Sequence, residues 1–346
     1  MKILVTGGAG LVGSHTAEYY AKKGDEVIAL DNLMRSSLFG YNKDSVEFNW
    51  NYLAQFDNIK RIKGDVREEL DVMKALGDGV DAVIHTAGQP GVPLSMKIPK
   101  EDFSINAYGT LNVLECVRKV CPKAAFIYCS TNKIYGENVD TITLEEKETR
   151  YVYKSKKGVP ETLSVDITGH TPYGVSKLVG DLYVQEYAHI YGMKTAVFRM
   201  SCIYGTRQFG FEDQGWVAWF VIANLTGQDI VIYGNGKQVR DLLYADDLVE
   251  AYDKFINSDR KHDVFNIGGG PRNTTSLLEF IGLVEQKTGI KFRKIEHKAW
   301  RPSDQKVYIS DISKVSKALS WKPDIAVEKG LEKLIEWVGA NNKFFI

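Results

Sequence analysis

The sequence has no net charge, because its 44 Lys and Arg residues are balanced by 44 Asp and Glu residues. Such a chain has no bulk charge with which to hold a nucleic acid or an acidic membrane surface. It lacks any run approaching the ~18 apolar residues of a membrane-spanning helix, and too few apolar residues precede Thr6 for a signal peptide. We expect a cytoplasmic protein with neither a nucleic acid nor a membrane as its partner.

Cysteine is also scarce, and the four thiols at positions 116, 121, 129 and 202 form no C-x-x-C pair. No histidine stands at a metal-like spacing from them, so we predict reduced, buried thiols and no metal site. His85 lies in an apolar run from Val83 to Ala87, where a hydrogen-bonded structural role is favoured over a catalytic one.

Short apolar runs alternate with helical patterns through the first 200 residues, which predicts an α/β fold with a doubly wound, Rossmann-type parallel sheet. The predicted strands are Lys2–Thr6, Glu26–Asp31, Ile59–Lys63, Ala82–Thr86, Ala125–Ser130 and Lys194–Arg199. The predicted helices are Gly13–Lys23, Glu68–Leu76, Ala107–Val120 and Tyr173–Tyr191.

The pattern becomes irregular after about residue 200, which predicts a smaller C-terminal lobe over 201–346. The domain at 1–200 is expected to receive segments near 235–270 as well, since Val264–Asn266 can return to the main sheet. The strands predicted after residue 200 are Ile230–Tyr233, Val264–Ile267 and Lys291–Ile295. The helices predicted there are Trp216–Leu225, Asp246–Asn257, Ser276–Thr288 and Val327–Asn341.

A glycine-rich turn directly follows the first predicted strand and opens the first helix. Gly7 allows the tight turn, Gly10 lets the backbone approach a pyrophosphate, and Gly13 lets helix and strand pack closely, with Leu11 and Val12 between them. Asp31 ends the second strand, where a carboxylate accepts the ribose hydroxyls and repels a 2′-phosphate. This pattern predicts NAD as the cofactor, although Arg35 nearby leaves NADP open.

Two later strand ends fit the same cofactor. Asp65 and Val66 can meet the adenine edge, and the small residues of Ala87-Gly88-Gln89 can pass beneath the pyrophosphate. For Asp65 the alternative is a helix N-cap.

Tyr173 and Lys177 stand four residues apart in a helical pattern, so they share one helix face. A lysine beside a tyrosine favours the phenolate, so we predict a lowered Tyr173 pKa and a base that can deprotonate an alcohol. Thr131 ends a predicted strand and can hydrogen-bond a substrate oxygen beside Tyr173. The spacing alone also arises by chance in many helices.

With these motifs, the chain resembles the extended short-chain dehydrogenase/reductase family over essentially its whole length. The motifs are Thr6–Gly13, Asp31-Asn32-Leu33, Gly64-Asp65-Val66, Asn106-x-x-Gly109-Thr110, Tyr173-x-x-x-Lys177, Arg240-Asp241-Leu242 and Arg301-Pro302-x-Asp304. The resemblance implies that Thr131, Tyr173 and Lys177 are catalytic and that Tyr173 and Lys177 also line the cofactor. It makes Asn32 a cofactor neighbour and Asn106 a support of the active-site backbone, with a turn or cap role for Asn106 as the alternative.

Within that family the chain is most similar to the CDP-paratose/CDP-tyvelose 2-epimerase group. The shared stretches are Ser130–Gly136, Arg207-Gln208-Phe209, Asp213–Val217, Gly234–Asp241 and Ser303-Asp304-Gln305. Met200-Ser201-Cys202 lacks the Asn that is usual in relatives acting on UDP-sugars. Asn132-Lys133 replaces the Asp-Glu pair of sugar-nucleotide dehydratases, so elimination of water is disfavoured.

The resemblance implies NAD-dependent epimerisation of a CDP-hexose at C-2, through transient oxidation and re-reduction. Arg240 and Arg301 suit the substrate diphosphate, with ion pairs to Asp241 and Asp304 as the alternative. The other expected substrate contacts are Asn132, Gln208, Trp216, Gln238 and Asp304. Gln89 is a further amide suited to sugar hydroxyls, and Trp216 and Phe209 can equally be core residues.

Helices Ala107–Val120 and Tyr173–Tyr191 carry more apolar positions than one buried face requires. In the family such helices pair across a two-fold axis, so a homodimer is expected, with a tetramer left open. Two rival functions remain at this point: a UDP-sugar 4-epimerase, and a non-catalytic NAD-binding sensor that keeps the fold.

Overall fold

The computed structural model describes residues 1–40 and 43–345, and the chain divides into two units. The first unit comprises residues 1–134, 172–199 and 249–265, and the second comprises residues 135–171, 200–248 and 266–346. Both units are therefore assembled from segments that are distant in the sequence.

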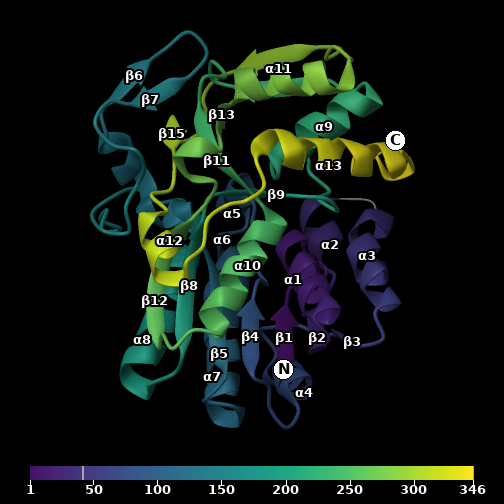
Figure 1. The fold of residues 1–346 in the computed structure, drawn as a ribbon, viewed down its shortest axis with the longest axis vertical. Helices are drawn as coiled ribbons and strands as arrows, with labels where there is room; N and C mark the ends of the chain where they lie inside the picture. Colours follow the sequence, from purple (N-terminus) through teal and green to yellow (C-terminus); the bar gives the residue numbers. More distant parts are fainter. Residues whose placement is uncertain (41–42, 346) are drawn as a thin grey trace. The chain divides into compact units, whose positions relative to one another are not determined.

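The first unit is built on a seven-stranded sheet (Figure 1). Its strands are β1 (Lys2–Thr6), β2 (Glu26–Asp31), β3 (Ile59–Lys63), β4 (Ala82–His85), β5 (Ala125–Thr131), β8 (Thr195–Met200) and β12 (His262–Ile267). Their order is β12-β8-β5-β4-β1-β2-β3, and the pairs from β5 to β3 are parallel. The order reverses between β1 and β4, which confirms the predicted doubly wound sheet.

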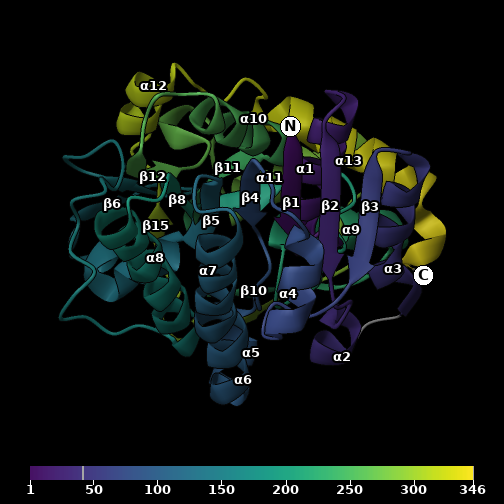
Figure 2. The ribbon, with the colours of Figure 1, turned by 90° about the horizontal axis from the view of Figure 1, so that it is seen from below.

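Helices cover both faces of this sheet. Those of the first unit are α1 (Leu11–Lys22), α2 (Arg35–Phe39), α3 (Lys43–Tyr52), η1 (Leu53–Gln55), α4 (Glu69–Leu76), α5 (Val92–Lys97), α6 (Pro99–Phe103), the π-helix η2 (Ser104–Tyr108), α7 (Gly109–Val120), α8 (Pro172–Tyr191) and α10 (Ala245–Ile256). Helices α4, α7 and α8 lie on one face, and α1 and α10 lie on the other (Figure 2). On that second face, the Tyr19 hydroxyl and the Lys23 ammonium donate to Asp253 at 3.2 and 2.8 Å.

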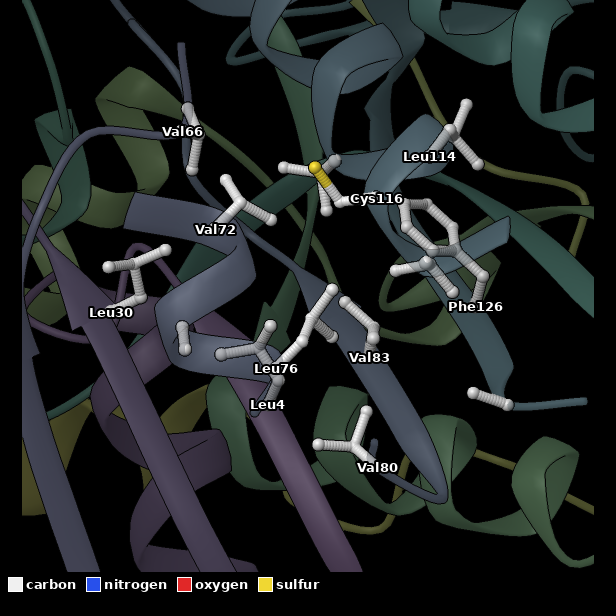
Figure 3. Packing of buried hydrophobic residues seen from close by; sticks show 14 of the residues in the cluster. Leu4, Leu30, Val66, Val72, Leu76, Val80, Val83, Leu114, Cys116 and Phe126 are labelled. Atoms are coloured by element: carbon white, nitrogen blue, oxygen red, sulfur yellow. The ribbon is translucent and has the colours of Figure 1, made fainter. Parts of the chain in front are cut away.

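The central strands β1, β2, β4, β5 and β8 are largely apolar runs because both of their faces are buried. Leu4, Val83 and Phe126 of neighbouring strands are fully buried, and they pack against Leu76 of α4 and Leu114 of α7 (Figure 3). Each such side chain contributes about 1.5–3 kcal/mol on burial. This core fixes the strand ends from which the polar residues of the site project.

The second unit contains smaller sheets and a helical core. Its elements are η3 (Asn132–Thr141, beginning in the first unit), β6 (Leu144–Glu146), β7 (Tyr151–Tyr153), β9 (Cys202–Tyr204), α9 (Trp216–Thr226), β10 (Ile230–Tyr233), β11 (Val239–Tyr244), η4 (Gly270–Arg272), β13 (Thr274–Ser276), α11 (Leu277–Thr288), β14 (Ile295–Lys298), β15 (Val307–Tyr308), α12 (Ser313–Leu319), α13 (Val327–Ala340) and η5 (Asn342–Phe344). Strand β11 pairs with β13, β15 and β9. Helices α9, α11 and α13 pack together around Phe280, Val221 and Leu334.

Some predicted elements differ from the structure. The strand predicted at Lys291–Ile295 begins only at Ile295, as β14, because β14 pairs in register with Ile230–Tyr233. The helix predicted to begin at Ala107 begins at Gly109, as α7, because Ala107 and Tyr108 belong to the π-helical turn η2. Strand β12 lies at one edge of the main sheet, next to β8.

The four cysteines are free thiols. Burial raises the pKa of Cys116 and Cys129 to about 11 and that of Cys202 to about 12, and it also raises the pKa of Cys121.

His85 is fully buried, with Thr6 Oγ1 at 2.7 Å from Nδ1 and Thr110 Oγ1 at 3.0 Å from Nε2. Burial lowers its pKa to about 3, so it is a neutral structural residue, as predicted. In the described residues no helix is both long and apolar enough to cross a bilayer.

Candidate active site

The glycine turn joins β1 to α1 and is closed by its own backbone. Gly7 has a positive φ of 71°, and its carbonyl accepts from the Gly10 N–H at 3.0 Å. A methyl group built on Gly13 would lie 2.0 Å from the Gly7 carbonyl oxygen. Leu11 begins α1, so the first N–H groups of the helix point out of this turn, where an anion is favoured.

Asp31 lies at the end of β2 and braces the same turn. Its carboxylate accepts from the Ala9 N–H at 2.9 Å and the Leu33 N–H at 2.7 Å. Burial raises the Asp31 pKa, although these two bonds oppose the shift. Each carboxylate oxygen keeps a lone pair with which to accept from a ribose hydroxyl.

Asp65 and Asn32 meet beside Asp31. The Asn32 amide donates to Asp65 Oδ2 at 2.9 Å, and the Arg67 guanidinium donates to the same oxygen at 2.7 Å. Burial raises the pKa of Asp65, but the hydrogen bonds from Arg67 and Asn32 together have a larger effect in the opposite direction. The pKa of Asp65 is therefore lower than its ordinary value. The N-cap of α4 is Glu68, so the N-cap alternative for Asp65 is wrong. Val66 is buried in the core under α7.

Arg35 opens α2 and lies over the ring of Phe39, 5.7 Å from its centroid. Phe39 in turn packs against Gly91, where an added methyl group would lie 2.8 Å from its ring. The Arg35 guanidinium therefore packs on the face of the Phe39 ring.

The residues after β4 lie close to Lys177. Thr6 Oγ1 accepts from the Ala87 N–H at 3.3 Å, and Gly88 is exposed. A methyl group at Gly88 would lie 3.0 Å from Asn106 Oδ1 and 3.9 Å from Lys177 Nζ. Asn106 Oδ1 accepts from the Gln89 N–H at 2.8 Å, and its Nδ2 donates to the Gln89 carbonyl at 3.1 Å. The side chain of Asn106 thus bonds to both the N–H and the carbonyl group of Gln89, and it fixes the segment that follows β4.

Tyr173 and Lys177 lie in the first two turns of α8, and Thr131 ends β5. Burial raises the pKa of Tyr173 to about 12, and a hydrogen bond with Thr131 opposes the shift. Burial also lowers the pKa of Lys177 to about 8. The predicted lowering of the Tyr173 pKa is therefore wrong, because burial disfavours the charged form of each residue. The helical spacing shows that the two are neighbours, but it does not show how deeply they are buried.

Lys177 is 6% exposed, and its ammonium lies 4.3 Å from the ring centroid of Tyr128. The Tyr128 hydroxyl donates to the Lys177 carbonyl at 3.2 Å. A methyl group at Gly180 would lie 2.3 Å from that hydroxyl, so the glycine allows α8 to approach β5. This contact fixes the height of Lys177 above the sheet.

Three buried polar residues were missed by the sequence reading. Asp102, Ser176 and Asp181 are each at most 1% exposed, and they bond to Asn106, Gln89, Ser130 or Arg199 around the Tyr173 and Lys177 positions. One signal was available, since Asp102 and Asn106 stand four residues apart and therefore share a helix face.

The remaining substrate candidates, apart from Asn132, lie in the second unit. Arg240 pairs with Asp304 at 2.7 Å, whereas Arg301 pairs with Asp213 at 2.7 Å. Gln208 and Gln238 are 5% and 4% exposed, and Trp216 opens α9 and packs on Phe280. Both arginines thus form ion pairs, but with other partners than expected: Asp304 replaces Asp241 as the partner of Arg240, and Asp213 replaces Asp304 as the partner of Arg301. Phe209 packs on Trp337 and Phe345 as a core residue.

The NAD dependent epimerase/dehydratase family matches residues 3–268 of the chain. The chain belongs to this family. The result confirms the resemblance seen in the sequence, because the matched range contains the glycine turn, Thr131, Tyr173 and Lys177.

Individual relatives cover the whole of this epimerase/dehydratase. It is 38% identical to CDP-paratose 2-epimerase of Salmonella typhi over 98% of this chain and 100% of that protein. It is 32% identical to a putative UDP-glucose 4-epimerase of Methanocaldococcus jannaschii over 99% of both. The crystal structure of UDP-glucuronic acid 4-epimerase from Bacillus cereus, in complex with UDP-glucuronic acid and NAD, superposes with a TM-score of 0.82 at 27% identity, covering 99% and 100% of the two chains.

The cofactor of this epimerase/dehydratase is NAD, as the sequence predicted. The residues present fit it. The turn has no side chain where a Cβ on Gly7 or Gly13 would collide with backbone, and the Asp31 carboxylate disfavours a 2′-phosphate.

Proposed function

We propose that this epimerase/dehydratase inverts C-2 of a CDP-hexose, interconverting CDP-paratose and CDP-tyvelose or a closely related pair. The observation that carries the proposal is the full-length similarity of 38% to CDP-paratose 2-epimerase. The site agrees with that reaction class, because it combines a hydride-transfer cofactor with a hydroxyl base and offers no carboxylate directly after Thr131.

In this proposal Tyr173 takes the proton of the sugar hydroxyl, and Thr131 donates a hydrogen bond to the reacting oxygen. Bound NAD supplies a two-electron acceptor that is restored within each turnover. Tyr173 Oη holds the proton while the keto sugar rotates to present its other face, and it then returns the proton to the sugar oxygen. The proton and hydride that leave the sugar both come back, so the reaction is balanced without a second substrate.

Lys177 assists in two ways. Its ammonium lies 3.9 Å from the position that a methyl group on Gly88 would take, and in this proposal it binds a ribose hydroxyl of the cofactor. Its positive charge also stabilises a phenolate on the same helix face. Because burial lowers its pKa to about 8, this charge is present at neutral pH and is lost above that value.

Dehydration is disfavoured by the side chains after Thr131. Removal of water needs an acid and a base that exchange protons with the sugar, and Asn132 and Lys133 follow Thr131 where the family resemblance implies two carboxylates in a dehydratase. Asn132 is 8% exposed, and an amide does not transfer protons in this pH range. It is suited instead to bind a sugar hydroxyl.

The second unit supplies groups suited to a nucleotide diphosphate. Arg240 pairs with Asp304 and Arg301 pairs with Asp213, each at 2.7 Å, and a diphosphate can replace these carboxylates as their partner. The carbonyl oxygens of Gln208 and Gln238 are buried, and within the described residues they accept no hydrogen bond. Such acceptors suit donors of a ligand, namely a sugar hydroxyl or the amino group of cytosine.

Product analysis tests the proposal. Purified protein is incubated with CDP-paratose, CDP-glucose, UDP-glucose and UDP-galactose in parallel, and the products are identified by NMR of the anomeric and C-2 protons. Interconversion at C-2 of a CDP-sugar is expected. Epimerisation of UDP-galactose at C-4 with no change in any CDP-hexose would overturn the assignment.

That second outcome defines the alternative function, a UDP-sugar 4-epimerase. It is favoured by the 32% identity to the putative UDP-glucose 4-epimerase and by the shared fold of the UDP-glucuronic acid 4-epimerase. Both functions use the same base and cofactor, so they differ in the nucleotide of the substrate and in which sugar carbon faces the base and the cofactor.

We also propose that two copies of the chain pair through α8. Val175, Leu182 and Ile190 are 45%, 48% and 63% exposed, and their spacing of seven and eight residues places them on one helix face. Phe103 and Tyr108, on elements that contact α8, are also half exposed. A second copy presenting the same stripe would bury these side chains symmetrically, as in a four-helix bundle.

A further inference from the structure

Asp102 is a carboxylate with no exposed surface. Its Oδ2 accepts from the Ser176 hydroxyl at 2.6 Å, and its Oδ1 accepts from Gln89 Nε2 at 2.7 Å and from Asn106 Nδ2 at 3.1 Å. In the described part of the chain it forms no ion pair. A buried carboxylate held by neutral donors alone is costly to the fold, and its position beside the proposed base suggests a role in the reaction.

The bonds of Asp102 join three segments that carry the site. Gln89 follows β4, Asn106 lies in η2, and Ser176 lies in α8 between Tyr173 and Lys177. The Asn106 amide also donates to Ser176 Oγ at 3.1 Å, and the Ser176 hydroxyl lies 3.1 Å from the Tyr173 carbonyl. The Asp102 carboxylate thus connects the first turn of α8 to the segment that follows β4.

Other ionisable groups also face Tyr173 and Lys177. They are Asp181 on α8, Cys129 and Tyr128 on β5, and His85 on β4. Asp181 is paired with Arg199 at 3.0 Å, the thiol and the phenol are held neutral by burial, and His85 is neutral. Asp102 is therefore the carboxylate near Lys177 whose charge is not balanced by a guanidinium.

We propose that Asp102 is a positioning residue, which anchors the catalytic turn of α8 through Ser176 and keeps the Lys177 ammonium protonated by its negative charge. The proposal rests on the catalytic roles assigned to Tyr173 and Lys177. It does not depend on which nucleotide sugar is the substrate. Burial has the largest effect on the pKa of Lys177 and lowers it, whereas Cys129, Asp181 and, to a smaller extent, Asp102 raise it.

The charge is tested by titrating Lys177 in the NAD-loaded protein, without any sugar. Lysine is labelled with ¹³C at Cε, and the Lys177 signal is identified by its absence in Lys177→Arg. In the wild type it should titrate near pH 8, apart from solvated lysines near ~10.4. The Asp102→Asn variant keeps the shape and most hydrogen bonds but not the charge, so the midpoint should fall. An unchanged midpoint would overturn the electrostatic role.

The anchor is tested separately with Ser176→Ala, which removes the hydroxyl but leaves the carboxylate. We expect kcat to fall on the order of tenfold through a misplaced base, with KM unchanged and the Lys177 midpoint unshifted. A wild-type kcat in this variant would overturn the anchoring role. Ser95→Ala is the matched control for Ser176→Ala. Ser95 is buried to the same extent, but its hydroxyl donates to the Val92 carbonyl at 2.7 Å within its own helix.

If Asp102→Asn does not fold, Ser176→Ala still decides the anchoring, and Asp102→Glu decides the charge. The glutamate keeps the negative charge, so its Lys177 midpoint should stay within a few tenths of a unit of the wild type even if kcat falls. A large shift in that variant would contradict the proposal. Should no CDP-hexose react, the titration result stands, so failure of the proposed substrate and failure of this inference remain distinguishable.

Discussion

Tyr173 and Lys177 lie one helical turn apart, and burial works against the charged form of each. The pKa of the phenol is raised to about 12 while that of the ammonium is lowered to about 8. Raising the pH therefore favours the base but removes the charge that assists it. Activity of the pair should increase with pH up to about 8 and level off or fall beyond it.

Replacing the phenol tests its role directly. Tyr173→Phe keeps the ring and removes the group that accepts the proton, so kcat should fall on the order of 10²–10⁴-fold. The glycine turn and Asp31 are untouched, and the NAD content of the purified variant should equal that of the wild type. Tyr183→Phe on the same helix is the control, because Tyr183 is 40% exposed. Equal turnover in Tyr173→Phe would show that another group is the base.

His85 makes the stability of the protein depend on pH. Its pKa is lowered from an ordinary value of 6.5 to about 3 by burial, so below pH 6.5 the unfolded chain binds a proton that the folded chain excludes. Stability is then complete above 6.5 and should fall by up to about 1.4 kcal/mol per pH unit as the pH drops toward 3.

Chemical denaturation at several values between about pH 4 and pH 7 measures this slope. His85→Gln retains hydrogen-bonding capacity and does not titrate, so its slope should be shallower than that of the wild type. Equal slopes in both proteins would mean that other groups control the acid sensitivity.

At the scale of elements, the turn between β1 and α1 depends on its glycines. In Gly13→Ala the added methyl group would lie 2.0 Å from the Gly7 carbonyl oxygen, so helix and strand must separate. We expect NAD affinity to fall on the order of 100-fold, as measured by calorimetry on cofactor-stripped protein.

The control for this substitution is Gly282→Ala in α11, where an added methyl group meets no atom within 4 Å. Alanine is favoured over glycine inside a helix, so this variant should be more stable by about 1 kcal/mol with NAD affinity unchanged. Normal NAD binding in Gly13→Ala would show that the turn can relax without loss of its function.

The central strands of the parallel sheet could be predicted closely because they are buried on both sides and read as nearly unbroken apolar runs. Strand β11 was missed, since Arg240 and Asp241 interrupt its apolar pattern although Asp241 is fully buried among backbone donors. The glycine turn and the Tyr173/Lys177 pair were visible as local spacings. Asp102 was not recognised, because its partners Gln89 and Ser176 come from segments that only the fold brings together.

At the scale of the whole molecule, the α8 stripe predicts association. Leu182→Glu would place a charge at the centre of the proposed contact, where a second copy would bury it unpaired. The wild type should sediment as a dimer and the variant as a monomer. Leu70→Glu is the control, because Leu70 on α4 is 84% exposed and lies outside the stripe. A dimer that persists in Leu182→Glu would place the interface elsewhere.

The buried thiols have a practical consequence for such measurements. With a pKa of about 11 for Cys116 and Cys129 and about 12 for Cys202, on the order of one thiol in ten thousand or fewer is ionised at pH 7. The native protein should therefore react slowly with maleimide dyes. A single Leu70→Cys substitution, on α4 outside the stripe where the side chain is 84% exposed, would then accept a fluorophore in preference to the natural cysteines, and energy transfer between donor- and acceptor-labelled copies would follow subunit exchange.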